Sequence, residues 1–534
     1  MSFLGLGVLT WMTFLPVIGM FIVLLLPKEK KDAIRWTSVL FTFLQLVLAL
    51  FIYLKFNRGM AGVNTEAGFQ FTEKFTWIDI KSVSWFGRIH IDYFMGIDGL
   101  SVLMVILTAL ISFIAVFASW GIEKSLRGYF GLLLLLDTGM MGVFTSLDFF
   151  LFYIFWEVML LPMYFLIGVW GGPRREYAAI KFFLYTLFGS VLMLLAMLAL
   201  YFSVSVADPA TGERVHTFNM LAMMNPANYD VGSILGGIGT YWRYVAFVGL
   251  FIGFAIKVPI FPFHTWLPDA HVEAPTAISV ILAGVLLKMG TYGLMRVSFP
   301  MFPDATAYFQ IPIALLGFIN IVYGALVAMA QDDFKKLIAY SSISHMGVVV
   351  LGMAALNTQG MTGAIMQMFN HGTITAMLFL IVGVIYDRAH TRGLNDFGGL
   401  MNQMPKYSAV MSIAFFAALG LPGLSGFISE AFAFLGAFQV ESIRTITIAS
   451  TVGIVLTAGY MLWTLQRLFL GALPEKWKSL PDINGRELFT LIPLAVIVIF
   501  LGIYPAPMID MMTSAVNTLV DIVNKGGGTA MLGH

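Results

Sequence analysis

The sequence predicts an all-α, polytopic membrane protein with about 14 transmembrane helices, two of which are interrupted. Hydrophobic residues make up 59% of the chain and charged residues 11%, whereas soluble domains carry about 25% charged residues. A single water-soluble core cannot bury so much apolar surface. Most apolar side chains are therefore expected to face lipid or the inside of a helix bundle.

Apolar segments of membrane-spanning length follow one another along the whole chain. The first lacks a preceding basic segment and exceeds the roughly 7 to 15 apolar residues of a secretory signal, so we expect a retained helix. The predicted helices comprise residues 3–26, 35–56, 94–119, 129–146, 148–170, 179–205, 243–266, 274–297, 306–330, 335–356, 362–386, 406–438, 445–470 and 487–505. The connections 57–93 and 207–242 are expected to lie outside and to form no separate domain, and the second is expected to be an ordinary loop.

Helices 7 and 12 are predicted to be broken. The apolar run before Lys257 has 12 residues, and Pro259 cannot continue a helical hydrogen-bond ladder; residues 421–426 interrupt helix 12. Both breaks fall on the fourth helix of a five-helix unit, and two units with an odd number of helices have inverted orientations. The predicted parts are helices 1–3 (1–128), a first repeat of helices 4–8 (129–300), a second, inverted repeat of helices 9–13 (301–470), and helix 14 with a tail (471–534).

The distribution of positive charge predicts the orientation, because Lys and Arg concentrate at the cytoplasmic ends of helices. With both termini outside, 18 of the 30 basic residues fall in cytoplasmic loops and 10, including Arg243 and Arg296, fall in outer loops. The remaining two, Lys257 and Lys288, fall inside predicted helices.

Five ionisable residues inside predicted helices are the main candidates for chemistry. A charge at the bilayer centre costs at least about 2.5 to 3.5 kcal/mol, so such groups need a partner or a function. Buried Glu and Lys side chains that interact can change charge state together, and His relays protons through either ring nitrogen. We therefore predict a proton-transfer row of Glu157, Lys257, Lys288, His345 and Glu430.

Each of these residues also has a structural interpretation. Glu157 and Lys257 would form a purely structural ion pair. His345, like His371, would be a core histidine bonded to a neighbouring helix, and Glu430 would cap the helix that resumes after the break.

Secondary candidates for proton transfer are His371, His264 and Asp137. A further group is expected in the cytoplasmic loop after helix 7, at the mouth of a proton path; it comprises Asp269, His271 and Glu273. The segment with Asp332, Asp333, Lys335 and Lys336 is expected to be an ordinary cytoplasmic turn.

The composition argues against a redox cofactor in this chain. There is no cysteine, and hence no ligand for an iron–sulfur cluster of the usual kind or for a Cys-based zinc site. The His264–His271 spacing is a poor metal signature. The net charge of +1 does not suggest a nucleic-acid partner.

Several motifs closely resemble the antiporter-like subunits of proton-pumping NADH:quinone oxidoreductase, respiratory complex I. The motifs are Lys257-Val258-Pro259, Trp266-Leu267-Pro268-Asp269-Ala270-His271, Ala274-Pro275-Thr276, Leu286-Leu287-Lys288 and Ser341-Ser342-Ile343-Ser344-His345-Met346-Gly347. The resemblance covers roughly helices 3 to 14. The antiporter-like subunits of complex I are of three types, L, M and N, and the resemblance is closest to the M type. The L and N types carry a lysine on helix 12, whereas the M type carries a glutamate, which Glu430 resembles here.

The resemblance implies a non-redox, proton-translocating subunit in a bacterial inner membrane, with neighbouring antiporter-like subunits as partners and with flavin and iron–sulfur clusters in other subunits. Glu157 and Lys257 would form the buried pair that drives transfer, and Lys288 would be the central relay. His345 and His371 would pass protons along the axis, and Glu430 would lie at the exit or at the boundary with the next subunit.

Two alternatives remain open at the level of sequence. The same family includes subunits of multisubunit cation/proton antiporters and of membrane-bound hydrogenases, which would give the chain a different partner set. A redox carrier with a haem held by His345 and His371 on adjacent helices is the second alternative.

Overall fold

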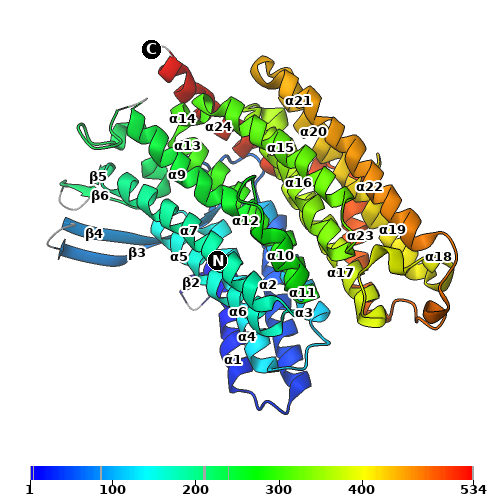
Figure 1. Ribbon diagram of the computed structural model, residues 1–534. Coiled ribbons are helices and arrows are strands. Elements are labelled where there is room, and N and C mark those ends of the chain that lie inside the picture. The colour runs from blue at the N-terminus through cyan, green and yellow to red at the C-terminus, as the bar shows by residue number, and fades with distance from the viewer. Residues whose placement is uncertain (1, 4, 84–86, 209–211, 238–239, 532–534) are drawn as a thin grey trace.

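The computed structural model describes residues 2–3, 5–83, 87–208, 212–237 and 240–531. Within these ranges, 11 helices are long and apolar enough to cross a membrane. The prediction of a polytopic α-helical membrane protein is therefore confirmed. Figure 1 shows the N-terminal helices gathered at one end of the molecule and the yellow and orange C-terminal helices along one side.

Four N-terminal helices form a bundle of their own. They are α1 (Val8–Leu25), α2 (Lys31–Lys55), α3 (Val102–Ala118) and α4 (Leu126–Thr145). α1 packs against α2 and α4, and α3 also contacts α2 and α4. Small residues allow close approach, because a side chain at Gly19 of α1 would collide with Phe41 of α2.

A long β-hairpin occupies most of the first outer connection. Strands β3 (Gln70–Val83) and β4 (Gly87–Ile97) pair antiparallel and project from the helices at the left of Figure 1. Along β3, Phe71, Phe75 and Trp77 are spaced at even intervals, as expected for one face of a strand. No strand was predicted here, and the prediction that helix 3 begins at residue 94, inside β4, was wrong.

The remaining strands are short. β1 (Ser2–Phe3) pairs with β2 (Leu6–Gly7), and β5 (Ser205–Ala207) pairs with β6 (Arg214–His216). The second outer connection is thus partly ordered. Its other elements are helix α8 (Met220–Met223) and the 3-10 turn η2 (Pro226–Asn228), and the first connection contains the 3-10 turn η1 (Glu66–Gly68).

The first broken helix consists of α9 (Tyr241–Lys257) and α10 (Trp266–Glu273). The interruption lies directly after Lys257, as predicted from the short apolar run and Pro259. α10 packs against α7 (Arg175–Tyr201) and α16 (Phe334–Ala354). The helices before α7 are α5 (Phe149–Val158) and α6 (Leu160–Trp170).

The span that carries Lys288 is continuous, but two of its five segments are π-helical. Its segments are α11 (Thr276–Ile281), the π-helix η3 (Leu282–Leu286), α12 (Leu287–Gly293), the π-helix η4 (Leu294–Ser298) and α13 (Phe299–Met301). All of its residues are buried except the half-buried Thr276. π-helical turns are rare and occur mostly at functional sites.

The C-terminal half is organised around α17 (Thr358–Ala389), which packs against α11, α16, α20 and α23. Its residues from Gly360 to Ile385 are all buried. The surrounding helices are α14 (Pro303–Tyr308), α15 (Gln310–Met329), α18 (Leu400–Gln403), α19 (Pro405–Ala418), α20 (Ser425–Gln439), α21 (Arg444–Ser450), α22 (Val452–Phe469), α23 (Gly485–Ile503) and α24 (Ala506–Met531), with 3-10 turns η5 (Leu394–Asp396), η6 (Glu441–Ile443) and η7 (Glu475–Trp477).

The second predicted break lies between α19 and α20. Gly420 and Gly423 adopt φ angles of 79° and 92° in this segment, in the left-handed region that favours glycine. The chain leaves one helix, turns, and begins another before Glu430.

Candidate functional site

Lys288 lies at the centre of the helix bundle and is fully buried. Its ammonium group donates a hydrogen bond to the carbonyl oxygen of Ala283, which is five residues earlier in the π-helical segment η3. The same nitrogen lies 2.6 Å from Nδ1 of His371 on α17. Lys288 thus has a titratable partner on another helix, which its own sequence neighbourhood did not reveal.

The contacts continue from His371 to a second histidine and a carboxylate. The rings of His371 and His345 lie 5.8 Å apart, centre to centre, and Nδ1 of His345 lies 3.1 Å from Oε1 of Glu430. Nε2 of each histidine is buried and has no hydrogen-bond partner among the described residues. A cavity of about 10 Å³ adjoins both rings and Glu430, close to the volume that one buried water molecule needs.

These contacts bear on the alternatives. Glu430 is the sixth residue of α20, beyond the first turn where a capping carboxylate acts, so the interpretation as a helix cap is wrong. His345 and His371 are buried and bond to neighbouring helices, as the structural interpretation expects, and in both cases the partner is an ionisable group. The small cavity beside the two rings cannot hold a haem, because even drug-sized ligands need about 300 Å³ or more.

Lys257 and Glu157 lie near the first break, but no ion pair joins them within the described part of the chain. The Lys257 ammonium group is buried over the rings of Trp156 and Phe182, at 4.9 and 5.7 Å from their centres. Oε1 of Glu157 is buried without a hydrogen-bond partner, and its charge acts on Lys257 from a distance. The expected pair is therefore separated in this structure, with the Trp156 ring against the ammonium group.

The backbone of the break between α9 and α10 is bonded to an asparagine that the sequence analysis did not single out. Asn320 on α15 accepts a hydrogen bond from the backbone N–H of Phe261 at 2.8 Å and donates one to the carbonyl of Pro259 at 3.1 Å. Both backbone groups lie outside any helical ladder and need a partner when buried. A buried polar residue inside the apolar segment 306–330 was the available signal.

His264 and Asp137 do not contact this row. His264 lies between the two halves of the broken helix, with Nε2 3.3 Å from the hydroxyl of Tyr323. Asp137 lies on α4 in the N-terminal bundle, where Oδ1 accepts a 2.7 Å hydrogen bond from Ser112.

The residues expected in a cytoplasmic loop after helix 7 instead lie on α10, and His271 is completely buried. Its ring stacks on Phe379 at 4.4 Å, and neither ring nitrogen has a partner among the described residues. The charges of Lys288 and Lys335 both act on it. Because α10 packs against α16, the second half of the broken helix brings His271 into the interior.

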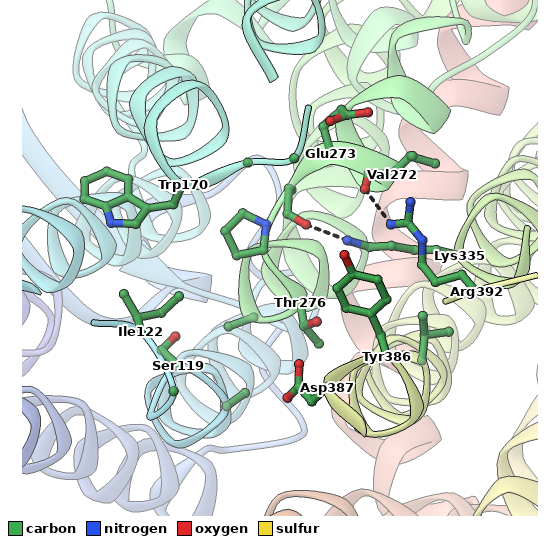
Figure 2. A pocket seen from close by; sticks show the side chains of 18 of the residues that line it. Ser119, Ile122, Trp170, Val272, Glu273, Thr276, Lys335, Tyr386, Asp387 and Arg392 are labelled. Atoms are coloured by element: carbon green, nitrogen blue, oxygen red, sulfur yellow. Dashed lines mark hydrogen bonds between the residues drawn. The ribbon is translucent and has the colours of Figure 1, made fainter. Parts of the chain in front are cut away.

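A cavity of about 510 Å³ opens beside α10, on the side predicted to be cytoplasmic. Figure 2 shows Glu273, Lys335, Asp387 and Arg392 among its lining residues. Lys335 is buried and donates to the carbonyl of Ala274 at 2.5 Å, so its assignment to an ordinary turn was wrong. A water-filled approach from this side would thus reach a buried ammonium group.

Two further arginines are buried rather than exposed in outer loops. Arg296 and Asp98 form a fully buried ion pair. Arg243 and Asp304 form a two-pronged pair at 2.8 and 2.9 Å. Arg296 belongs to a predicted helix end, and hydropathy alone could not show that Asp98, in the turn between β4 and α3, supplies its carboxylate.

An arginine of the β3–β4 hairpin forms an ion pair with the β5–β6 loop. Arg88 donates to both oxygens of Asp79, at 2.8 and 3.0 Å, and also to Asp208. The hydrogen bonds from Arg88 hold the pKa of the Asp79 carboxyl below its ordinary value of 3.8. The hairpin is thus fixed by charge as well as by backbone pairing.

Comparison with known proteins gives consistent matches. Residues 146–457 match the family model described as NADH:quinone oxidoreductase/Mrp antiporter, TM. The chain is 40% identical over 529 residues to NADH-quinone oxidoreductase subunit M of Rhodobacter capsulatus, covering 98% of each chain. It is 39% identical over 508 residues to NADH-ubiquinone oxidoreductase chain 4 of Chondrus crispus, covering 94% of this chain and 96% of that one.

The solved structures agree. A chain of respiratory complex I from Thermus thermophilus matches with a TM-score of 0.81 and 28% identity, over 96% of this chain and 99% of that one. A chain of the Mrp complex from Dietzia sp. matches in fold, with a TM-score of 0.80 and 20% identity over 97% and 99% of the chains. The chain therefore belongs to the subunit M family of NADH:quinone oxidoreductase, the antiporter-like, proton-translocating membrane subunits of complex I.

Proposed function

We propose that protons cross this subunit along the buried row Lys288, His371, His345 and Glu430. The observation that carries the proposal is the continuity of the contacts: an ammonium group 2.6 Å from one imidazole, and a second imidazole 3.1 Å from a carboxylate. Groups at hydrogen-bond distance can exchange protons directly or through one water molecule.

The proton moves between named atoms in this proposal. The Lys288 ammonium donates its proton to Nδ1 of His371, and the resulting imidazolium releases a proton from Nε2. A water molecule beside both rings passes that proton to Nε2 of His345, which in turn gives up the proton on Nδ1 to Oε1 of Glu430. After one transfer His371 carries its proton on Nδ1 and His345 carries its proton on Nε2. Each ring must then return to its starting tautomer, by a ring flip or by proton exchange through water, before Lys288 can deliver the next proton.

Loading would come from the cytoplasmic side. The cavity shown in Figure 2 leads to Lys335, and it is also lined by Val272 and Glu273, which follow His271 on α10. The two unpartnered ring nitrogens of His271 can accept a proton from the cavity side and donate one toward Lys288. His264, which bonds to Tyr323 beside the break, would play a supporting part.

Glu157 and Lys257 would control the row rather than form part of it. When the two charges approach, each stabilises the ionised state of the other. When Lys257 instead lies against Trp156, as in this structure, that stabilisation is weaker and the positive charge favours release of the proton on Lys288. Quinone reduction elsewhere in the complex would drive the change.

The proposed architecture has about 14 transmembrane helices, counting each broken helix once, with helices 4–8 (129–300) and 9–13 (301–470) as inverted repeats. Residues 1–128 and 471–534 flank them. The subunit would lie in a bacterial inner membrane with both termini on the periplasmic side. Its partners would be neighbouring antiporter-like subunits, and it would hold no cofactor, with flavin and iron–sulfur clusters in other subunits.

The test uses the whole complex in sealed vesicles. Lys288→Met keeps the side-chain volume and removes the charge, and Lys406→Ala removes an exposed lysine as the matched control. We expect Lys288→Met to lower proton uptake per quinone reduced while the complex still assembles, and Lys406→Ala to match the wild type. Unchanged pumping by assembled Lys288→Met would refute the proposal, and sodium-driven exchange insensitive to quinone inhibitors would favour a cation/proton antiporter.

A further inference from the structure

The N-terminal bundle contains a second buried polar cluster, outside the segment 146–457 that matches the family model. Its centre is Asp137 on α4, whose exposed fraction is 1%. Ser112 of α3 donates to one carboxyl oxygen, and the other oxygen has no partner among the described residues. Gln45 of α2, also buried, donates to the carbonyl of Met12 on α1 at 3.2 Å.

Other unpartnered oxygens lie around this centre. Oε1 of Gln45 and the hydroxyls of Thr13 and Thr138 are buried without partners within the described ranges. Gly131 of α4 faces Met20 of α1. Thr138 lies seven residues after Gly131 on α4, and Thr13 lies seven residues before Met20 on the antiparallel α1. Seven residues are two helical turns, so Thr138 and Thr13 lie at a similar height in the bundle. Four helices thus contribute polar groups to one buried level of the bundle.

Hydrogen-bonded groups lead from the outer side to within one helical turn of Thr13. Glu73 of the β3–β4 hairpin accepts hydrogen bonds from the backbone N–H of Leu9 at 2.6 Å and from the hydroxyl of Thr10 at 2.5 Å. The Thr10 hydroxyl also lies 2.7 Å from that of Tyr93. Thr13 lies one turn further along α1, on the same face as Thr10. A carboxylate at the outer surface is therefore linked, turn by turn, to the Asp137 level.

A polar stripe also runs from this level toward the cytoplasmic side. Arg35, Ser38, Thr42 and Gln45 are buried and follow one another at intervals of three or four residues along α2, which places them on one face. Arg35 bonds to Glu123 at 2.9 Å. The stripe ends at these charged groups, so the bundle has polar contacts toward both of its ends.

This cluster is separate from the proposed central row. On α4, Gly139 and Gly142 face Met159 and Phe155, near Glu157, and Asp137 is rotated by about 160° from Gly139. No described basic residue forms an ion pair with Asp137. The charged groups on α4 and on the helices that pack against it are Lys31, Asp32, Arg35 and Lys55 on α2, Arg127 on α4, Glu157 on α5 and Lys288 on α12.

The charge balance suggests what the cluster binds. An isolated buried carboxylate is strongly disfavoured and becomes neutral by taking up a positive charge. A proton on the free oxygen of Asp137 would neutralise the carboxyl without a basic partner. We propose that Asp137 is a proton-binding carboxyl at the centre of a lateral polar path through the N-terminal bundle, connected to the outer side through Thr13, Thr10 and Glu73.

Infrared difference spectroscopy of the whole complex tests the protonation of Asp137. We expect a carbonyl stretch of a protonated carboxyl that shifts in D₂O, is lost in Asp137→Asn and is retained in Thr145→Val, a buried hydroxyl on the same helix bonded only locally. A band that is identical in Asp137→Asn would overturn the proposal. So would a band that responds to sodium ions at constant pH, because sodium rather than a proton would then neutralise the site.

The rate of the D₂O shift tests the path independently. Thr10→Val and Thr13→Val remove the hydroxyls that lie between Glu73 and Asp137 and should slow the D₂O shift of the Asp137 carbonyl band, whereas Thr145→Val should leave its rate unchanged. An unchanged rate in Thr13→Val in an assembled complex would refute the outer connection. Neither result depends on pumping through Lys288, so the two proposals fail separately.

Discussion

His371 offers a way to separate positioning from proton transfer in the central row. Its Nδ1 accepts from the buried Lys288 ammonium at 2.6 Å, and its other nitrogen faces His345. In His371→Asn the amide oxygen can still accept from Lys288, but the side chain cannot take up and release a proton near neutral pH. In His371→Phe both properties are lost.

The expected magnitudes differ between the two variants. A hydrogen bond to a charged group contributes about 1.5 to 3 kcal/mol, so His371→Phe should lower the stability of the assembled subunit by that amount, and His371→Asn should lower it much less. A positioned acid–base group contributes about 10² to 10⁴ in rate. Both variants should therefore slow the proton-transfer step by about 10²-fold or more.

The assay compares quinone reduction with proton uptake in vesicles that contain the complete complex, together with thermal unfolding of the detergent-solubilised complex. Transfer lost in both variants, with a stability loss only in His371→Phe, supports the relay. Wild-type pumping by His371→Asn would show that His371 merely positions Lys288, and the proposed route through its ring would then be wrong.

Three further outcomes follow from other contacts. Asn320→Ala leaves two buried backbone groups of the break unsatisfied, at about 1 to 3 kcal/mol each, so the unfolding temperature of the complex should fall, whereas a Gln substitution should recover part of it. Arg296→Met leaves the Asp98 carboxylate buried and unpaired and should lower the stability of the folded subunit by about 3 to 5 kcal/mol. The double variant with Asp98→Asn should be more stable than Arg296→Met alone. Equal instability of the two variants would contradict the pairing. The pKa of Asp79 is lowered in the folded protein. Its bond to Arg88 therefore stabilises the hairpin fully above pH 3.8, and this stabilisation is lost as the pH falls through the lower, folded-state pKa. Proteolysis of the hairpin should increase only in acid, and Arg88→Ala should abolish that pH dependence.

The membrane-spanning helices could be predicted because apolar length is a local property. The break after Lys257 was equally visible, since a short apolar run, a lysine and Pro259 lie together in the sequence. The β3–β4 hairpin was missed because its segment was interpreted only as a polar connection, although Phe71, Phe75 and Trp77 are spaced at even intervals, as on one face of a strand. Alternation of period two was the signal, and hydropathy averaged over a long window removes it.

The site could be predicted only as a set of residues. Lys288, His345 and Glu430 stand out as charges within apolar segments, but the contact between Lys288 and His371 joins residues 83 positions apart. The burial of Lys335 and Arg296 depends in the same way on which helix lies opposite. Sequence therefore indicated which groups would be costly to bury, whereas the packing of α17 against its neighbours decided which of them meet.

The π-helical segment before α12 gives the Lys288 ammonium an acceptor within its own span. The carbonyl of Ala283, five residues earlier in η3, accepts a hydrogen bond from Lys288. The ammonium therefore keeps one partner that does not depend on the position of α17. Such a partner would hold Lys288 in place between one proton delivery and the next.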